Sequence, residues 1–242
     1  MKINKLLFVL IIVVAVSLGF FVGQSMTPAN RALRKAQELA RRGITEKKEA
    51  VEILTKQKDL LDYSFKYAQL EKERQIIALS LANILIKYEM WPDAIKYLEI
   101  AKEILPGDFA VNYNLGFVYY KLFQLEKEPL KKDKYYKLAE SYINTALQID
   151  PEDIDANYLK GVFLFENRLY TDALAYFSKV LEKNPNEVNT LFTLGRMYYD
   201  MGELEKARNV YLKLQTVLPK RSAQMDRVIN NLEIINKELG KR

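Results

Sequence analysis

The chain has 242 residues, of which 49% are hydrophobic and 28% charged, and its formal net charge is +6. This composition is typical of a folded chain and not of a disordered one. The sequence contains no Cys and no His, which excludes disulfides, thiolate nucleophiles, most zinc and iron–sulfur sites and imidazole acid–base catalysis. Positive and negative residues are interspersed, and no run of five or more charges of one sign occurs. The sequence therefore indicates a solvated surface and no basic arm that would bind nucleic acid.

An apolar segment follows the short tail of residues 1–5. Residues 6–22 read LLFVLIIVVAVSLGFFV, with only Ser17 and Gly19 interrupting the run. As a helix it would span roughly 26 Å, slightly less than a hydrocarbon core of about 30 Å. We therefore predict a transmembrane or signal-anchor helix at residues 6–23. Cleavage as a secretory signal is the alternative, because Gly23-Gln24-Ser25 resembles a small-x-small cleavage site.

The charges around this segment leave its orientation open. Lys2 and Lys5 precede it and favour an N-terminus on the cytoplasmic side, whereas several Arg and Lys residues follow between 31 and 42 and favour the opposite. We expect the N-terminus inside and the rest of the chain outside the cytoplasm, since the immediately flanking charges are the upstream ones.

Residues 24–74 are predicted to form a helical connector or a degenerate repeat. Thr27-Pro28 is a helix start and Gly43 a helix stop. Neither Gly nor Pro occurs from Glu46 to Met90, so no such residue marks the break before the next helix. The candidate positions for this break are Asp62 and Lys72 to Arg74.

In most of the remaining chain, similar residues recur at a fixed spacing of 34 residues. The spacing relates four pairs of residues, which are Gly161 and Gly195, Ala173 and Ala207, Phe177 and Tyr211, and Pro185 and Pro219. A constant period of this length indicates a repeat array. Two antiparallel helices approach closely where a small residue on one meets a large residue on the other, so the pattern predicts paired helices that each end at a proline.

This pattern resembles the tetratricopeptide repeat family, whose unit is a helix–turn–helix of about 34 residues with a closing Pro. The resemblance implies an all-α, right-handed α-solenoid with four units at residues 75–108, 109–153, 154–187 and 188–221. The third unit departs from the family pattern, because Lys160 stands where Leu is preferred and Arg168 where Gly is common in the turn.

The second unit is longer than the others. The interval from Gly116 to Ala139 is almost twice the interval between the corresponding residues of the third unit, Gly161 and Ala173. The additional residues lie in LFQLEKEPLKKDKYY, around residues 122–134. The favoured interpretation is a longer surface loop. The alternative is that both helices extend beyond the array, bend at Pro129, and form a projection that contacts a partner or the membrane.

Residues 222–242 are predicted to form a capping helix. Met225, Val228, Leu232, Ile235 and Leu239 form one apolar stripe at helical spacing. Terminal repeats need such a helix, apolar towards the array and polar outwards.

The resemblance also implies a binding surface, since the first helix of each unit in this family lines a concave groove. Aromatic residues on these helices repeat at steps of four and three, as in Tyr113, Phe117 and Tyr120. Some of them are expected to be core residues, and the others to form a peptide-binding surface beside Lys or Arg. The candidate partner-binding residues are Asn83, Lys87, Tyr113, Phe117, Tyr120, Lys121, Tyr158, Val162, Phe165, Glu166, Phe192, Arg196, Tyr199 and Asp200.

One specialised use in the family, the grip on a chaperone's C-terminal carboxylate, is not favoured. Only Asn83 matches the residues that it requires, and Leu79 replaces the expected Lys.

These expectations combine into a non-enzymatic protein–protein interaction scaffold with no cofactor, no metal site, no small-molecule substrate and no nucleic acid partner. The sequence contains no GxSxG motif, no Gly-rich phosphate loop and no EF-hand. Asp153 and Asp155 are expected to favour a helix start and not to bind a metal. We expect a cell-membrane protein with repeats outside the cytoplasm, acting in envelope assembly, secretion or folding. A cleaved periplasmic or secreted module and a cytoplasm-facing regulator are the alternatives.

Overall fold

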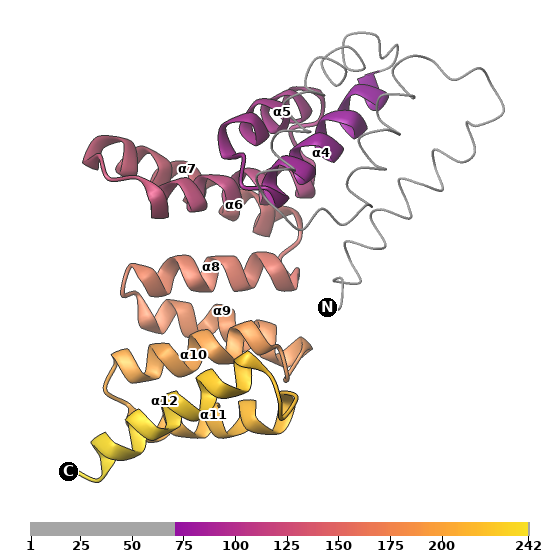
Figure 1. Cartoon of the computed structure of the whole chain (residues 1–242). Coiled ribbons are helices and arrows are strands. Elements are labelled where there is room, and N and C mark those ends of the chain that lie inside the picture. The colour runs from indigo at the N-terminus through magenta and orange to yellow at the C-terminus, as the bar shows by residue number, and fades with distance from the viewer. Residues whose placement is uncertain (1–70, 242) are drawn as a thin grey trace, which may run out of the picture. The chain divides into compact units, whose positions relative to one another are not determined.

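The computed structural model describes residues 71–241, and every element in that range is an α-helix (Figure 1). The described residues divide into two compact units, 71–114 and 115–241, and the division falls within one helix. The all-α prediction is confirmed for the described residues. The helices are α4 (Glu71–Lys87), α5 (Trp91–Ile104), α6 (Phe109–Leu125), α7 (Pro129–Ile149), α8 (Ile154–Glu166), α9 (Tyr170–Lys183), α10 (Val188–Asp200), α11 (Leu204–Val217) and α12 (Ala223–Leu239).

In the first unit, α4 and α5 form an antiparallel pair with a buried seam of small and large residues. Ala78 and Ala82 of α4 and Ala94 and Ala101 of α5 are fully buried, so the two backbones approach closely. Because α4 is continuous from residue 71, the predicted break at Lys72 to Arg74 is wrong. The other candidate break, at Asp62, lies outside the described residues, as do the apolar segment 6–23 and most of the connector 24–74.

The second helix of each pair ends two residues before a proline, as the sequence predicted. The helices α5, α7, α9 and α11 end at Ile104, Ile149, Lys183 and Val217, and Pro106, Pro151, Pro185 and Pro219 follow. Proline favours a helix end at this distance because it cannot continue the backbone hydrogen-bond pattern.

After Pro106, Pro151 and Pro185 an acidic residue caps the next helix, whereas Ser222 caps α12. The Asp153 Oδ1 accepts a hydrogen bond from the Ala156 amide at 2.7 Å, and Asp108 caps Val111 in the same way at 2.9 Å. Glu187 at the start of α10 accepts hydrogen bonds from the amides of Asn189 and Thr190. The predicted helix-start role of Asp153 is therefore confirmed.

Within each pair of the second unit, a glycine of the first helix faces a large side chain of the second. A Cβ built on Gly161 would lie 2.5 Å from a ring carbon of Phe177, and one on Gly195 would lie 2.9 Å from the ring of Tyr211. A Cβ on Gly116 would lie 2.8 Å from the Ile143 side chain. Real Cβ atoms essentially never show such distances, so glycine is what allows these helices to touch.

The turns of three pairs, α4–α5, α8–α9 and α10–α11, contain a residue with a left-handed backbone. Gly202 has φ +75°, Arg168 has φ +61° and Glu89 has φ +59°. A residue with a Cβ adopts this region at a cost of about 1–2 kcal/mol. The third unit therefore keeps the turn of the family although Arg168 replaces the usual Gly.

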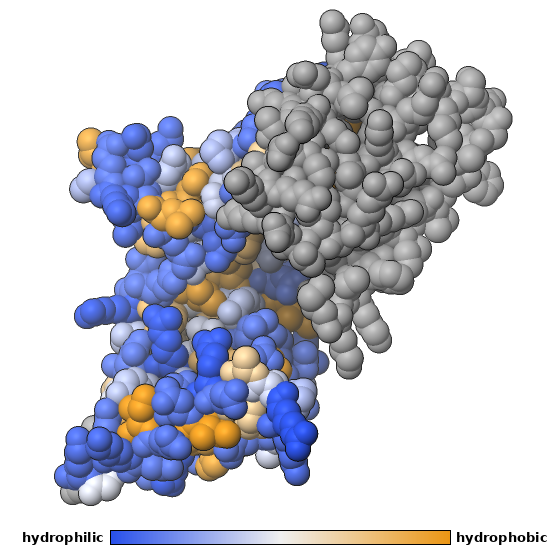
Figure 2. Space-filling view, in the orientation of Figure 1, coloured by the Kyte–Doolittle hydropathy of each residue, from blue (hydrophilic) through white to orange (hydrophobic). Residues whose placement is uncertain are grey.

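The insertion in the second unit is a helical hairpin. Helix α6 continues to Leu125 and α7 begins at Pro129, so the predicted surface loop is wrong and the alternative, two extended helices that bend at Pro129, is confirmed. Rings hold the two helices together, with centroids 5.8 Å apart for Tyr119–Tyr142 and 5.7 Å for Phe123–Tyr136. Leu125 and Leu130 are 64% and 81% exposed, and Figure 2 shows apolar atoms at the end of the hairpin.

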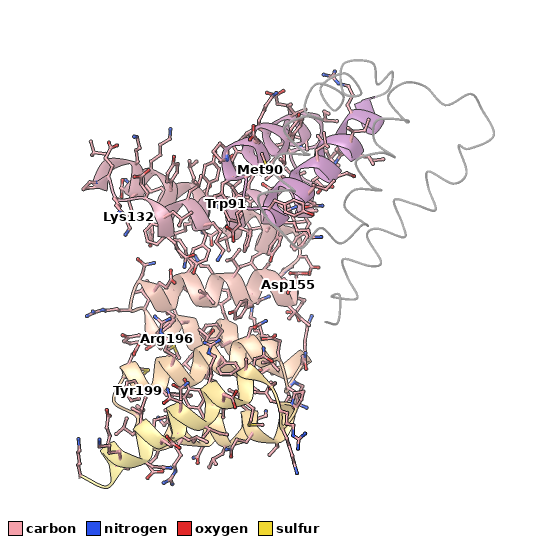
Figure 3. The ribbon with its side chains drawn as sticks, in the orientation of Figure 1. Met90, Trp91, Lys132, Asp155, Arg196 and Tyr199 are labelled. Carbon is pink, nitrogen blue, oxygen red and sulfur yellow. The ribbon has the colours of Figure 1, made fainter. Side chains whose placement is uncertain are left out.

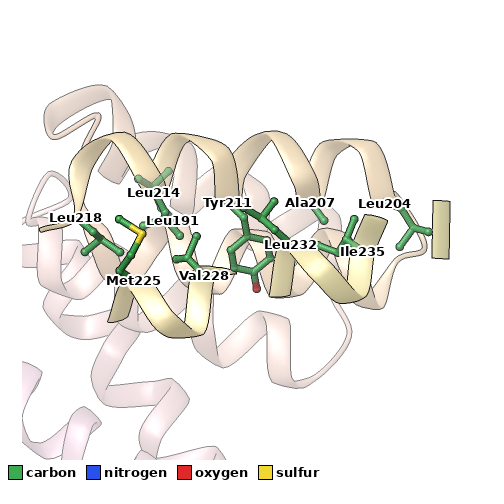
Figure 4. Packing of buried hydrophobic residues seen from close by; sticks show 10 residues of the cluster. All are labelled: Leu191, Leu204, Ala207, Tyr211, Leu214, Leu218, Met225, Val228, Leu232 and Ile235. Carbon is green, nitrogen blue, oxygen red and sulfur yellow. The ribbon is translucent and has the colours of Figure 1, made fainter. Parts of the chain in front are cut away.

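Helix α12 packs on α11 and closes the second unit. Met225, Val228, Leu232 and Ile235 are buried against Leu204, Tyr211 and Leu214, as Figure 4 shows, and Leu239 is partly buried beside them. The predicted apolar stripe is therefore confirmed. Ile229 occupies the register of the pair-forming glycines, one repeat after Gly195, and is 42% exposed. Helix α12 therefore lacks the glycine that allows close helix contact in the second unit's other first helices.

Within residues 71–241, no helix is both long enough and apolar enough to cross a membrane.

The glycine seam gives a first testable prediction. Gly161→Ala adds a methyl group at the buried Phe177 ring, and such overpacking costs about 1–3 kcal/mol. The better helix propensity of Ala offsets at most about 1 kcal/mol. We expect a net loss of about 1 kcal/mol or more in the free energy of unfolding, measured by urea denaturation. The control is Gly107→Ala, which has no atom within 4 Å of the new methyl group. An equal loss in both variants would contradict the role of the seam.

Candidate functional site

The predicted partner-binding residues fall in both units. Asn83, Lys87 and Tyr113 belong to the first unit, and the remaining residues belong to the second. The Asn114 side-chain amide donates to the Asn83 Oδ1 at 3.0 Å and so joins the first helices α4 and α6. The ring of Tyr113 stacks on Phe109 with centroids 5.9 Å apart, and Lys87 is exposed beside the Tyr88 ring.

In the second unit, the C-terminal part of α6 contacts α8 through polar groups. The Gln124 side-chain amide donates to the Tyr120 hydroxyl at 2.7 Å and to the Glu166 Oε1 at 2.9 Å. The ammonium of Lys121 lies 5.4 Å from the centroids of both the Phe117 and the Tyr120 rings. These contacts place charged groups of α6 and α8 next to one another on one side of the helices.

Helices α8 and α10 make a similar set of contacts. The Tyr158 hydroxyl lies 3.3 Å from the Thr193 hydroxyl. The Arg196 guanidinium lies over the Phe165 ring, 4.9 Å from its centroid, and Figure 3 labels Arg196 on α10. Since α8 precedes α10 by one repeat, a cation of the later first helix covers an aromatic ring of the earlier one.

Helix α12 continues this pattern. The Arg227 guanidinium lies 5.2 Å from the centroid of the Phe192 ring, and the Tyr199 hydroxyl donates to the Glu238 Oε1 at 2.7 Å. We call the surface formed by residues 117–124 of α6 together with α8, α10 and α12 the first-helix face. Sequence reasoning missed the part that α12 contributes. The sequence did indicate it: Met225 and Val228 lie one repeat after the buried Leu191 and Leu194 of α10, so α12 occupies the position of a further first helix.

Two of the predicted binding residues are buried. Tyr120 and Phe165 are each only 4% exposed. Contacts between neighbouring repeats cover their rings, so these two are core residues, as we expected for some of the aromatic residues. A role for them in binding stays a prediction. Phe117, Lys121, Tyr158, Val162, Phe192 and Tyr199 are partly exposed, and Glu166, Arg196 and Asp200 are exposed.

A pocket of about 440 Å³ lies on the first-helix face between α10 and α12. Its walls combine two cations with aromatic and aliphatic side chains, and they include Phe192, Arg196, Tyr199, Tyr211, Arg227 and Ile234. This volume is within the range of sites that bind a ligand or a few side chains of a peptide.

Burial moves the pKa of Tyr120 and Tyr211 further above physiological pH. It raises the pKa of Tyr120, and the nearby Glu166 carboxylate raises that pKa further. Burial likewise raises the pKa of Tyr211, although the positive charges of Arg227 and Arg196 partly oppose this. The tyrosine hydroxyls therefore stay protonated and able to donate hydrogen bonds at physiological pH.

Lys160, which departs from the family pattern, has a structural role in the third unit. Its side chain is buried, and its Nζ lies 3.3 Å from the Glu140 Oε1 of α7 and 5.5 Å from the centroid of the Phe163 ring. The half-exposed Glu140 keeps the ammonium paired, which a buried charge requires. The ion pair thus joins α8 to α7, away from the first-helix face.

Within the described residues, no group of three or more acidic side chains is arranged to hold a metal ion. Asp155 lies beside the capping Asp153, and its pKa is raised by burial and by that second negative charge.

The tyrosine environment gives a second prediction. The ordinary pKa of a tyrosine is 10.0, and that of Tyr120 is higher in the folded state. Above pH 10 the unfolded chain therefore binds fewer protons than the folded chain, and stability falls as the pH rises. Tyr120→Phe removes this titration. We expect its free energy of unfolding to fall less than that of the wild type between pH 9 and pH 11, by about 1 kcal/mol, in urea denaturation at the two pH values. Equal losses would contradict the burial of the Tyr120 hydroxyl beside Glu166.

Comparisons with known proteins agree with this geometry. A family model described as anaphase-promoting complex, cyclosome, subunit 3 matches residues 132–214. A thermophilic TPR protein of Thermus thermophilus is similar in structure, with a TM-score of 0.63 and 18% identity over 84% of this chain and 98% of that one. A tetratricopeptide repeat protein from Parabacteroides merdae has a TM-score of 0.67 and 15% identity over 88% of this chain and 74% of that one.

A third similar structure is YrrB, described as a TPR protein with an unusual peptide-binding site. Its TM-score is 0.56 at 20% identity, over 81% of this chain and 89% of that one. At these identities the likeness concerns the fold. Together with the repeat register, the closing prolines and the glycine seams, it shows that the described helices have the fold of tetratricopeptide-repeat proteins.

Proposed function

We propose that the chain is a non-enzymatic scaffold that binds a segment of a partner protein on its first-helix face. The observation that carries this proposal is the row of cations, Lys121, Arg196 and Arg227, that lie over aromatic rings of the first-helix face. The Arg196 side chain is 65% exposed although it lies over Phe165. Packing between repeats needs the rings beneath it but not an exposed guanidinium on top. Aromatic residues beside Arg are typical of surfaces that bind proteins.

Two further facts favour binding over catalysis. The absence of His and Cys removes the side chain most often used for acid–base catalysis and the thiolate nucleophile. A structural neighbour is described as having a peptide-binding site, although that description belongs to YrrB.

The proposal includes a membrane tether at residues 6–23 that displays the repeats outside the cytoplasm. The apolar run LLFVLIIVVAVSLGFFV supports the tether, and Lys2 and Lys5 support this orientation. On this basis the partner is a protein of the cell envelope, bound during assembly, secretion or folding. Cleavage after residues 23–25 would instead release a periplasmic or secreted module, and the basic residues between 31 and 42 favour repeats that face the cytoplasm as part of a regulator.

Photo-crosslinking tests the binding face. A benzoylphenylalanine at Lys121, Glu166 or Asp200, on the first helices, should crosslink one common partner in cells. The same group at Glu182 of α9 or Lys213 of α11, which are exposed on second helices, should give little of that product. Each variant is checked for unchanged helicity by circular dichroism. Strong crosslinks from α9 and α11 with none from the first helices would contradict the proposal.

Membrane fractionation tests the tether. The full chain should stay in the membrane pellet after an alkaline carbonate wash, and a variant lacking residues 1–23 should move to the soluble fraction. Recovery of a soluble form that is shorter by about the length of the apolar segment would support cleavage.

Protease accessibility tests the orientation. Protease added to spheroplasts should digest the repeats before lysis. Protection until lysis would contradict the extracytoplasmic orientation and support the cytoplasm-facing alternative.

A further inference from the structure

The pocket between α10 and α12 contains two guanidinium groups that each lie over an aromatic ring. Arg196 lies over Phe165, and Arg227 lies over Phe192. A guanidinium that lies over a ring still has N–H groups at its edges. These edges are the groups that bind the two oxygens of a carboxylate.

The internal partners of these cations are weak. The Nε of Arg196 lies 3.8 Å from the Asp200 carboxylate, a side chain that is itself 39% exposed. Arg227 has no carboxylate within 4.0 Å among residues 74–241. The pocket therefore offers more positive charge than the fold uses.

The other walls suit the atoms next to a carboxylate. Ile234 and Phe192 provide apolar surface, and Ile234 is 42% exposed. Asn230 and Asn231 of α12 also line the pocket. An asparagine amide both donates and accepts, as the backbone of an extended peptide requires.

Two carboxylates near the pocket lower its positive charge. Asp200 lies beside Arg196, and Glu238 accepts the hydrogen bond of Tyr199, which lines the pocket. Because Asp200 partly neutralises Arg196, Arg227 is the cation that is left to balance, and one negative charge is enough to balance it.

We propose that this pocket binds an Asp or Glu side chain of the partner segment together with a neighbouring apolar side chain. This inference rests on the proposed function, because it names the chemistry that the first-helix face selects. The partner segment is then acidic and apolar, with the carboxylate between Arg196 and Arg227 and the apolar side chain against Phe192 and Ile234.

A display experiment separates this inference from the proposed function. Short random peptides displayed on phage are selected on the purified full chain in mild detergent, in parallel with an R196Q/R227Q double variant. We expect the wild type to enrich peptides in which Asp or Glu adjoins an apolar residue, and the double variant to lose that enrichment. Enriched peptides without acidic residues would overturn the acidic preference while leaving the binding face intact. No enrichment with either protein would overturn both.

The consensus peptide is then synthesised and its dissociation constant measured by fluorescence anisotropy. R196Q and R227Q should each weaken binding about tenfold, and the matched control Arg208→Gln, which removes the same charge from α11, should not. Replacing the acidic residue of the peptide with its amide should weaken binding to the wild type but not to the double variant. Equal weakening in the wild type and the double variant would contradict the pairing of the peptide carboxylate with Arg196 and Arg227.

Inorganic phosphate should displace the peptide no better than chloride at the same ionic strength. Preferential displacement by phosphate would contradict the carboxylate preference and indicate a phosphate site instead.

Discussion

The close contact between a glycine on one helix and a large side chain on the next is the constraint on which the second unit depends. Gly116, Gly161 and Gly195 each face a side chain that a single methyl group would strike. These contacts fix which side of each first helix packs against its own partner helix. The remaining side of α8 and α10 then meets the neighbouring repeats and the solvent, and Tyr158, Arg196 and Tyr199 of the first-helix face lie there. Helix α12, which has Ile229 at the glycine position, adds Arg227 to the same face.

The sequence predicted the fold well where a residue type at a given position is compatible with only one local structure. Prolines marked helix ends, Asp153 marked a helix start, and the stripe from Met225 to Ile235 marked a buried helix. The insertion was harder, because its composition of charged and aromatic residues suits either a loop or an exposed helix. Only the ring contacts between α6 and α7, such as Phe123–Tyr136, favour the helical hairpin.

The site was predicted less completely than the fold. The spacing of the aromatic residues placed Tyr120 and Phe165 on the first helices, but spacing does not show which rings a neighbouring repeat covers, and both are buried. Arg227 was missed because α12 was considered only as a cap. The pocket exists because this helix has two functions, closing the apolar seam with Val228 and presenting a cation over Phe192 with Arg227.

The central claim is that a partner lies on the first-helix face. Hydroxyl-radical footprinting measures this directly, because it reports the solvent exposure of individual aromatic side chains. With the partner or the selected peptide bound to the full chain, oxidation of Tyr158, Phe192 and Tyr199 should fall, and oxidation of Tyr170 and Tyr176 on α9 should stay unchanged. Protection of the α9 tyrosines with no change at Phe192 and Tyr199 would contradict the account.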